Sequence, residues 1–192
     1  MGRAAENAPK LEVRSRHELR EWLTRNHDRS PSVWLMTWKK HTDFYLSYGE
    51  LVEELLCWGW IDSQTRGVDD DRTSVLIAPR NPKSAWSAVN KEKVAAARAS
   101  GAMTEAGERL IRMAQDSGMW EFIDDVERLE VPADLALALC DLREGWEAYP
   151  RSVRRGTLEW IKTGRTDQTR AKRIAQVADS LAVGLRPPPF RR

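Results

Sequence analysis

The first half of the chain alternates between short β-rich runs and amphipathic segments. Residues 11–14 and 32–38 have the length and composition of strands. Each run is followed by a capping box, Ser15-x-x-Glu18 and Ser47-x-x-Glu50, with apolar residues at helical spacing behind it. The pattern predicts strand, helix, strand and helix in that order, with Gly59 ending the second helix.

Two more β-rich runs, residues 60–66 and 73–78, flank a turn of Gly and Asp residues at 67–71. Such runs around a short turn predict an antiparallel hairpin. From residue 87 the spacing is helical up to residue 183, with Gly and Pro residues as breaks. The order β-α-β-α-β-β followed by helices predicts an α+β fold, with a small mixed or antiparallel sheet and a helical C-terminal half.

These elements group into four segments. Residues 1–10 are predicted to be a disordered leader, and residues 11–128 an α+β domain that holds a Trp-rich cluster of motifs. Residues 129–185 are predicted to form a helical C-terminal domain or extension. Residues 186–192, which include three consecutive prolines, are predicted to be a Pro-rich tail that is extended and non-helical over residues 186–189.

The 192 residues include nine Trp but only three Phe and three Tyr. A chain of this length can bury one core without disulfides or metal, and 41% hydrophobic with 31% charged residues is ordinary for a globular protein. Nine indoles exceed what such a core needs, since each N–H requires a partner when buried. Either the core is rich in Trp, or some of these rings form the aromatic walls of a binding site.

The chain contains two cysteines, Cys57 and Cys140, with neither metal-ligand spacing nor a disulfide framework. That usage is typical of a reducing compartment. The N-terminus lacks the apolar stretch of a signal peptide, and no apolar run is long enough to span a membrane. We therefore expect a cytoplasmic protein without a membrane partner. The sequence has no phosphate-loop, dinucleotide-binding or zinc motif, which predicts no cofactor and no metal.

The net charge of +2 hides an asymmetry. Residues 143–192 contain twelve Lys or Arg against five Asp or Glu, a net +7, which leaves −5 for residues 1–142. One interpretation is a solvated helical surface, partly docked on the acidic first half. The other is a surface for nucleic acid or an acidic partner. In that case the side chains on the phosphates would be Arg165, Arg170, Lys172 and Arg173.

The strand predicted at residues 60–66 carries an unusual mixture of side chains. Because side chains alternate along a strand, Trp60, Asp62, Gln64 and Arg66 are predicted to share one face. An ordinary ion pair on a solvated face would account for Asp62 and Arg66. It would not explain why the large aromatic ring of Trp60 is on the same face. The presence of Trp60 therefore favours a face that contacts a ligand.

Lys39 and Lys40 lie at the end of the strand predicted at 32–38, which also contains Trp34 and Trp38. If this strand is a neighbour of the next one along the chain, two aromatic walls would flank a carboxylate and one or more cations. Such an arrangement is typical of a site for an anionic or aromatic ligand.

Arg80 lies between Pro79 and Asn81-Pro82, so its backbone is stiffened on both sides. A pre-positioned guanidinium is suited to gripping a carboxylate or phosphate. Ser84 and Ser87 are candidate caps of the next helix, whose free N–H groups would add to an anion site. We expect Arg80→Ala to abolish ligand binding at little cost in stability.

Together these residues predict a pocket between the strands at 59–66 and 33–40 and the start of the helix at 87–100. It would bind a small anionic or aromatic ligand, with or without catalysis. Arg and Lys would hold the anion, two Trp rings would stack on the ligand, and Asp62 would orient it or take a proton, which makes Asp62 the best candidate for a catalytic residue. The predicted ligand-binding residues are Lys39, Lys40, Trp60, Asp62, Arg66, Arg80, Ser84, Trp86, Ser87 and Asn90.

A series of motifs runs through most of the chain. They are Trp34 with Lys39-Lys40, Leu56-Cys57-Trp58-Gly59-Trp60-Ile61-Asp62, Pro79-Arg80 with Ser84-x-Trp86-Ser87-x-x-Asn90, Gly101, Gly118-x-Trp120 and Thr169-Arg170-x-x-Arg173-Ile174. In this combination the chain resembles the YdeI/OmpD-associated family, also called bacteriocin-protection proteins. The family's usual run Cys-Phe-Gly-Trp-Ile-Asp-Gly differs here at Trp58 and Ser63. The resemblance implies a link to protection against bacteriocins or antimicrobial peptides, and it implies no reaction or cofactor.

Three functions are therefore compared. The first is a cytoplasmic protein that binds a small anionic or aromatic ligand, and the second is a module for nucleic acid or an acidic partner. The third is a stress-associated interaction protein without a ligand. A screen against anionic metabolites would separate the first from the third, and salt-dependent binding to DNA or RNA would favour the second.

Overall fold

The structure is a computed structural model that describes residues 7–190. Residues 1–6 and 191–192 are outside it, and with them most of the predicted leader and the end of the predicted tail. The chain divides into two compact units, Met1–Phe122 and Ile123–Arg192. A sheet with helices in the first unit and helices in the second confirm the predicted α+β class.

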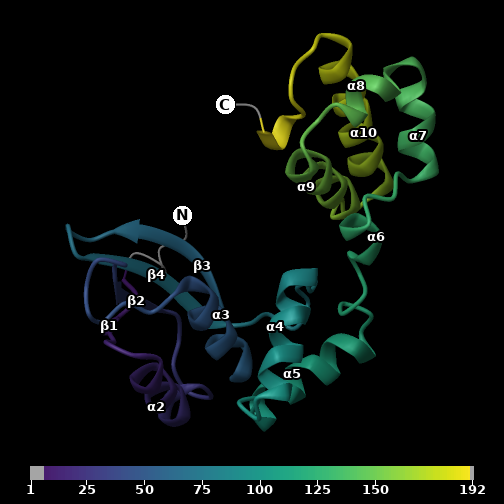
Figure 1. The fold of residues 1–192 in the computed structure, drawn as a ribbon. Coiled ribbons are helices and arrows are strands. Elements are labelled where there is room, and N and C mark those ends of the chain that lie inside the picture. Colours follow the sequence, from purple (N-terminus) through teal and green to yellow (C-terminus); the bar gives the residue numbers. More distant parts are fainter. Residues whose placement is uncertain (1–6, 191–192) are drawn as a thin grey trace. The chain divides into compact units, whose positions relative to one another are not determined.

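The first unit is built on a four-stranded mixed sheet in the order β1-β2-β4-β3 (Figure 1). The strands are β1 (Lys10–Glu12), β2 (Val33–Trp38), β3 (Trp60–Gly67) and β4 (Arg72–Pro79). β1 and β2 are parallel, and β4 is antiparallel to both β2 and β3. The predicted hairpin is confirmed, but β4 lies between the two strands that were expected to be neighbours across a pocket.

Two helices, α2 (Arg16–Asn26) and α3 (Tyr48–Cys57), cover one face of this sheet (Figure 1). Both begin where the capping boxes predict. The Ser15 hydroxyl accepts the amide hydrogen of Glu18, and Ser47 forms a complete capping box with Glu50. The core between the helices and the sheet is apolar, with Leu19, Leu23, Leu35, Leu55 and Ile77 fully buried.

The pairing of β3 with β4 is interrupted by a bulge. Asp62 lies opposite Ile77, and the next pair is Thr65 opposite Val75, so three steps along β3 correspond to two along β4. An extra residue reverses which face the following side chains occupy. The alternation predicted for the whole of residues 60–66 is therefore wrong beyond the bulge.

A buried carboxylate ties α3 to α2. Glu54 is completely buried, and its oxygens accept hydrogen bonds from Arg16 Nε at 2.8 Å, Arg20 Nη1 at 2.9 Å and Trp58 Nε1 at 3.1 Å. Such a group is tolerated in a core only when its charge is matched and its lone pairs are satisfied. These contacts make Glu54 a structural residue.

The first unit ends with α4 (Ala88–Ala99) and α5 (Glu105–Asp116). α5 approaches the end of α3 closely, because a Cβ added at Gly107 would lie 2.5 Å from the carbonyl oxygen of Cys57. Only glycine permits this contact between two helix backbones.

The second unit contains helices α6 (Asp124–Glu127), α7 (Ala133–Leu139), α8 (Arg143–Glu147), α9 (Arg151–Lys162) and α10 (Asp167–Ala182). The tail packs on this unit. Pro188–Phe190 form a 3-10 turn, and the Phe190 ring fills the space left by the missing side chain of Gly156. The prediction of extended backbone is therefore wrong at Pro188 and Pro189, which belong to this turn because the Phe190 ring has a packing site on the unit.

The helices between residues 7 and 190 are all too short or too polar to cross a lipid bilayer.

Candidate functional site

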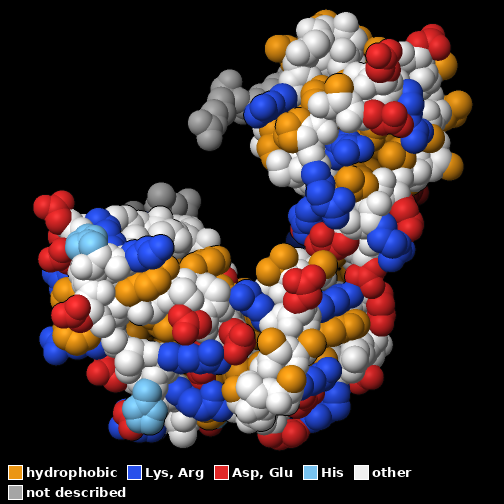
Figure 2. Space-filling view, viewed as in Figure 1, with side chains coloured by type: hydrophobic (Ala, Val, Ile, Leu, Met, Phe, Trp, Pro, Cys, Tyr) orange, Lys and Arg blue, Asp and Glu red, His pale blue; other side chains and the backbone are white. Residues whose placement is uncertain are grey.

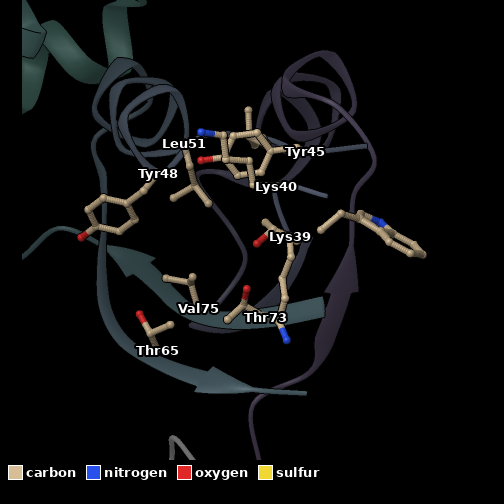
Figure 3. A pocket seen from close by; sticks show the side chains of 11 residues that line it. Lys39, Lys40, Tyr45, Tyr48, Leu51, Thr65, Thr73 and Val75 are labelled. Atoms are coloured by element: carbon tan, nitrogen blue, oxygen red, sulfur yellow. The ribbon is translucent and has the colours of Figure 1, made fainter. Parts of the chain in front are cut away.

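A cavity of about 280 Å³ opens in the first unit, between the sheet and the start of α3 (Figure 3). Its lining residues come from β2, β3, β4, α3 and the loop that precedes α3. They are Thr37, Trp38, Lys39, Lys40, Tyr45, Leu46, Tyr48, Leu51, Thr65, Thr73 and Val75.

The sheet side of the cavity is polar because three threonines meet there. Thr37 of β2 lies directly opposite Thr73 of β4, and Thr65 of β3 is brought to the same face by the bulge, opposite Val75. Further along this face Val33, Leu35 and Ile77 form the core. Among residues 7–190 the threonine hydroxyls have no hydrogen-bond partner, so they are available to a ligand.

The opposite wall is aromatic and apolar. Figure 3 shows Tyr45, Tyr48 and Leu51 on the helix side of the cavity, facing Thr65, Thr73 and Val75 on the strands. Tyr48 is the first residue of α3, and the backbone of Tyr45 forms a bridge with that of Trp38. Secondary structure therefore fixes both tyrosines at the mouth.

A hydrogen bond orients Tyr48. Its hydroxyl donates to Asp62 Oδ2 at 2.5 Å, which links α3 to the edge strand β3. Partial burial of the hydroxyl, followed by this hydrogen bond and the negative charge of Asp62, raises the pKa of Tyr48 to about 12. Asp62 therefore contributes to the cavity by orienting Tyr48, whose hydroxyl it accepts as a hydrogen-bond donor.

Two lysines make the cavity cationic. Lys39 lies along it with its ammonium group donating to the carbonyl oxygen of Asp69 at 2.6 Å (Figure 3). Lys40 is exposed and has no ion-pair partner within residues 7–190. The threonine hydroxyls and the lysine ammonium groups together form a donor-rich surface suited to an oxyanion.

The other predicted site residues lie elsewhere. Trp60 is in the core, where its indole N–H donates to the carbonyl oxygen of His27 at 3.0 Å and its ring meets Trp22 edge to face. The bulge turns Arg66 to the opposite face of the sheet, where its guanidinium stacks at 4.0 Å on the Trp34 ring. Trp60 and Arg66 therefore do not face the same space, contrary to the predicted alternation.

The backbone of Arg80 lies beside that of Gly59, the residue before Trp60, because the Arg80 amide donates to the carbonyl oxygen of Gly59 at 2.9 Å. Its side chain is only 7% exposed, lies 4.1 Å from the Trp86 ring centre and donates to the carbonyl oxygen of Ala85 at 2.6 Å. Burial lowers the pKa of Arg80 to about 10, and the negative charge of Asp62 opposes that shift. Trp86 covers the guanidinium, and this burial argues against the small stability cost expected for Arg80→Ala.

The remaining predicted residues belong to the start of α4. Ser87 is its N-cap and accepts the amide hydrogen of Asn90 at 3.3 Å, while the amide of Ser84 donates to the carbonyl oxygen of Asn81 in a turn. The structure thus brings Arg80, Trp86 and this helix start together. It brings Lys39, Lys40 and, through Tyr48, Asp62 together at the cavity.

Sequence reasoning missed most of the cavity's polar lining. Thr37, Thr65 and Thr73 were absent from the predicted site, and so were Tyr45 and Tyr48. A signal for Thr37 exists in the alternation of β2, where the inward positions run Val33, Leu35 and then threonine. No comparable signal exists for Thr65, whose face depends on the bulge.

Within residues 7–190 no group of three or more His, Cys, Asp or Glu side chains is arranged to hold a metal ion.

Two family models match the chain. Residues 11–110 match a family described as "Domain of unknown function (DUF8412)". Residues 128–184 match a family described as "Bacteriocin-protection, YdeI or OmpD-Associated", which confirms the suspected family for this segment. Of the motifs that carried the resemblance, Thr169-Arg170-x-x-Arg173-Ile174 lies within the matched range. The cavity lies within the first matched range. No curated protein and no solved structure matches the chain.

Proposed function

The chain belongs to the DUF8412 family and carries a YdeI/OmpD-associated segment linked to bacteriocin protection, and we propose that its first unit binds a small anionic ligand in the cavity beside α3. The observation that carries the proposal is that Lys40 and the hydroxyls of Thr37, Thr65 and Thr73 line one cavity and have no partner among residues 7–190.

The size of the cavity supports a small ligand. A volume of about 280 Å³ is just below the range of roughly 300–1,000 Å³ that is typical of sites for drug-sized molecules. Its electrostatics support an anion, since two ammonium groups line it. In this account Asp62 is a positioning residue, because its contact is with Tyr48.

We place this activity in the cytoplasm. Cys57 is buried and Cys140 is exposed, and both are free thiols, a state that a reducing compartment maintains. Export to an oxidising compartment would leave the exposed Cys140 open to disulfide formation.

The pairing of basic with acidic side chains in the second unit favours a small ligand over nucleic acid as the partner of this protein. Counted over the whole second unit, residues 123–192, thirteen Lys or Arg face eleven Asp or Glu, a net +2. Arg155 pairs with Glu127 at 2.7 Å, and Arg170 pairs with Asp134. On the face drawn in Figure 2, positive and negative side chains are interspersed over this unit. A phosphate backbone requires a more concentrated positive surface.

Isothermal titration calorimetry with acetate, phosphate and benzoate tests the proposal. At least one anion should bind, and Lys40→Gln should weaken its binding by about ten- to a hundredfold, because a hydrogen bond to a charged group contributes about 1.5–3 kcal/mol. Lys172→Gln removes the same charge from the second unit and should leave the affinity unchanged. If none of the three anions binds, the chain is better explained as an interaction protein without a ligand.

A further inference from the structure

The mouth of the cavity carries exposed aromatic rings that the fold does not need. Tyr45 is 47% exposed and Tyr48 is 58% exposed, although each lies beside the buried side of the sheet. Their neighbour Phe44 is also exposed, at 41%, and its ring contacts Trp38 edge to face at 5.4 Å and lies under the Arg14 guanidinium. Exposed apolar surface grouped around a concave site indicates contact with a partner molecule.

The two tyrosines are held in place without any ligand. The hydroxyl of Tyr48 is anchored on Asp62, and the backbone of Tyr45 is anchored on Trp38. A ring that is already oriented loses little conformational freedom when a ligand stacks on it. The hydrogen bond to Asp62 orients the Tyr48 ring, whereas the bridge fixes the backbone from which the Tyr45 ring extends, and both residues remain exposed.

The opposite wall and the lysines define where the charged end of a ligand would be. Thr65, Thr73 and Val75 face the tyrosine side across the cavity, and the Lys39 side chain extends between the walls toward Thr73 (Figure 3). A flat molecule between these walls has apolar contacts on one face and hydroxyls on the other. Its acidic group is then placed beside the ammonium groups.

We infer that the ligand of this cavity is a single-ring aromatic acid, with its ring against Tyr45 and Tyr48 and its carboxylate toward Lys39, Lys40 and Thr73. The inference rests on the proposed function, because it presupposes that the cavity binds an anion. The volume of about 280 Å³ is sufficient for one aromatic ring with its carboxylate.

Two carboxylates of matched charge and size separate ring recognition from anion recognition. Benzoate carries a flat aromatic ring, and cyclohexanecarboxylate carries a saturated ring of the same carbon number. Calorimetric titrations should show that benzoate binds about two- to tenfold more tightly, the usual range for one aromatic contact. Benzamide, which keeps the ring and lacks the charge, should bind more weakly than benzoate.

Variants at the mouth assign the preference to the tyrosines. The double variant Tyr45→Leu with Tyr48→Leu should bind the two carboxylates equally, whereas Tyr48→Phe, which keeps the ring, should retain the preference. A thermal melt confirms that each variant is folded before it is titrated.

The possible failures are distinguishable. If benzoate and cyclohexanecarboxylate bind equally and Lys40→Gln weakens both, the aromatic inference is overturned and the anion site stands. A preference that survives in the double leucine variant also overturns it. If no carboxylate and no phosphate binds, the proposed function fails and this inference fails with it.

Discussion

The hydroxyl of Tyr48 donates a hydrogen bond to Asp62 at 2.5 Å, across the gap between the first turn of α3 and the edge strand β3. This bond positions an exposed ring at the mouth of the cavity, and the negative charge of the same carboxylate acts on the buried Arg80. Asp62 therefore interacts with Tyr48 at the start of α3 and with Arg80, which follows β4.

The titration of Tyr48 should report that bond directly. Its pKa is raised to about 12 by partial burial and by Asp62. The difference in tyrosinate absorbance between the wild type and Tyr48→Phe should therefore titrate near pH 12, and Asp62→Asn should move it toward the ordinary value of about 10. Because the pKa of Tyr48 is higher in the folded chain than in the unfolded chain, the protonated hydroxyl contributes to the free energy of unfolding. This contribution is complete below about pH 10 and is lost as the pH rises through 12. A titration near 10 in the wild type would show that the bond is absent.

Arg80→Ala should destabilise the first unit by about 1–3 kcal/mol in urea unfolding, since it removes a buried stem and its contacts with Trp86 and Ala85. Lys83→Ala is the matched control, because Lys83 is exposed in the same loop and should change stability by less than about 0.5 kcal/mol. Equal stabilities for the two variants would contradict the packing described for Arg80.

Gly107→Ala should also be destabilising, by about 1–3 kcal/mol. In an ordinary helix this change stabilises by roughly 0.5–1 kcal/mol. Here the added Cβ would lie 2.5 Å from the backbone oxygen of Cys57 and 2.8 Å from that of Leu56, so α5 would have to move away from α3. Gly67→Ala has no heavy atom within 4 Å of the added carbon and is the control. A stabilising effect at Gly107 would mean that the two helices are not in backbone contact.

Filter binding of a DNA duplex and of a single-stranded oligonucleotide should give weak retention with little dependence on salt. Arg155, Lys162 and Arg170 are paired with acidic residues of their own unit, so these three cations contribute little counterion release on binding a phosphate backbone. Tight binding that falls steeply with salt would restore the nucleic-acid function.

The order and type of the elements were predictable because each has a local signal. The capping boxes at Ser15 and Ser47 mark helix starts, and the turn after Gly67 marks the hairpin. The strand order was not predictable, since the insertion of β4 beside β2 is a long-range pairing with no sequence signature.

The site was predictable only in part. Lys39 and Lys40 follow directly from the end of β2, and both line the cavity. The face of Arg66 depends on a one-residue bulge, which alternation cannot reveal. The burial of Arg80 depends on Trp86, six residues away, closing over it. The flanking prolines indicated that the backbone of Arg80 is fixed, but they do not predict how exposed its side chain is.

The position of a bound anion tests the central claim most directly. Amide chemical shifts of the full chain, followed in a proton–nitrogen correlation spectrum during a benzoate titration, should change together at Thr37, Lys40, Thr65 and Thr73, which line the cavity from three strands and the adjoining loop. The same titration of Lys40→Gln should need more benzoate to reach the same shifts. Changes clustered instead around Arg80 and Trp86, or spread over the second unit, would contradict the account.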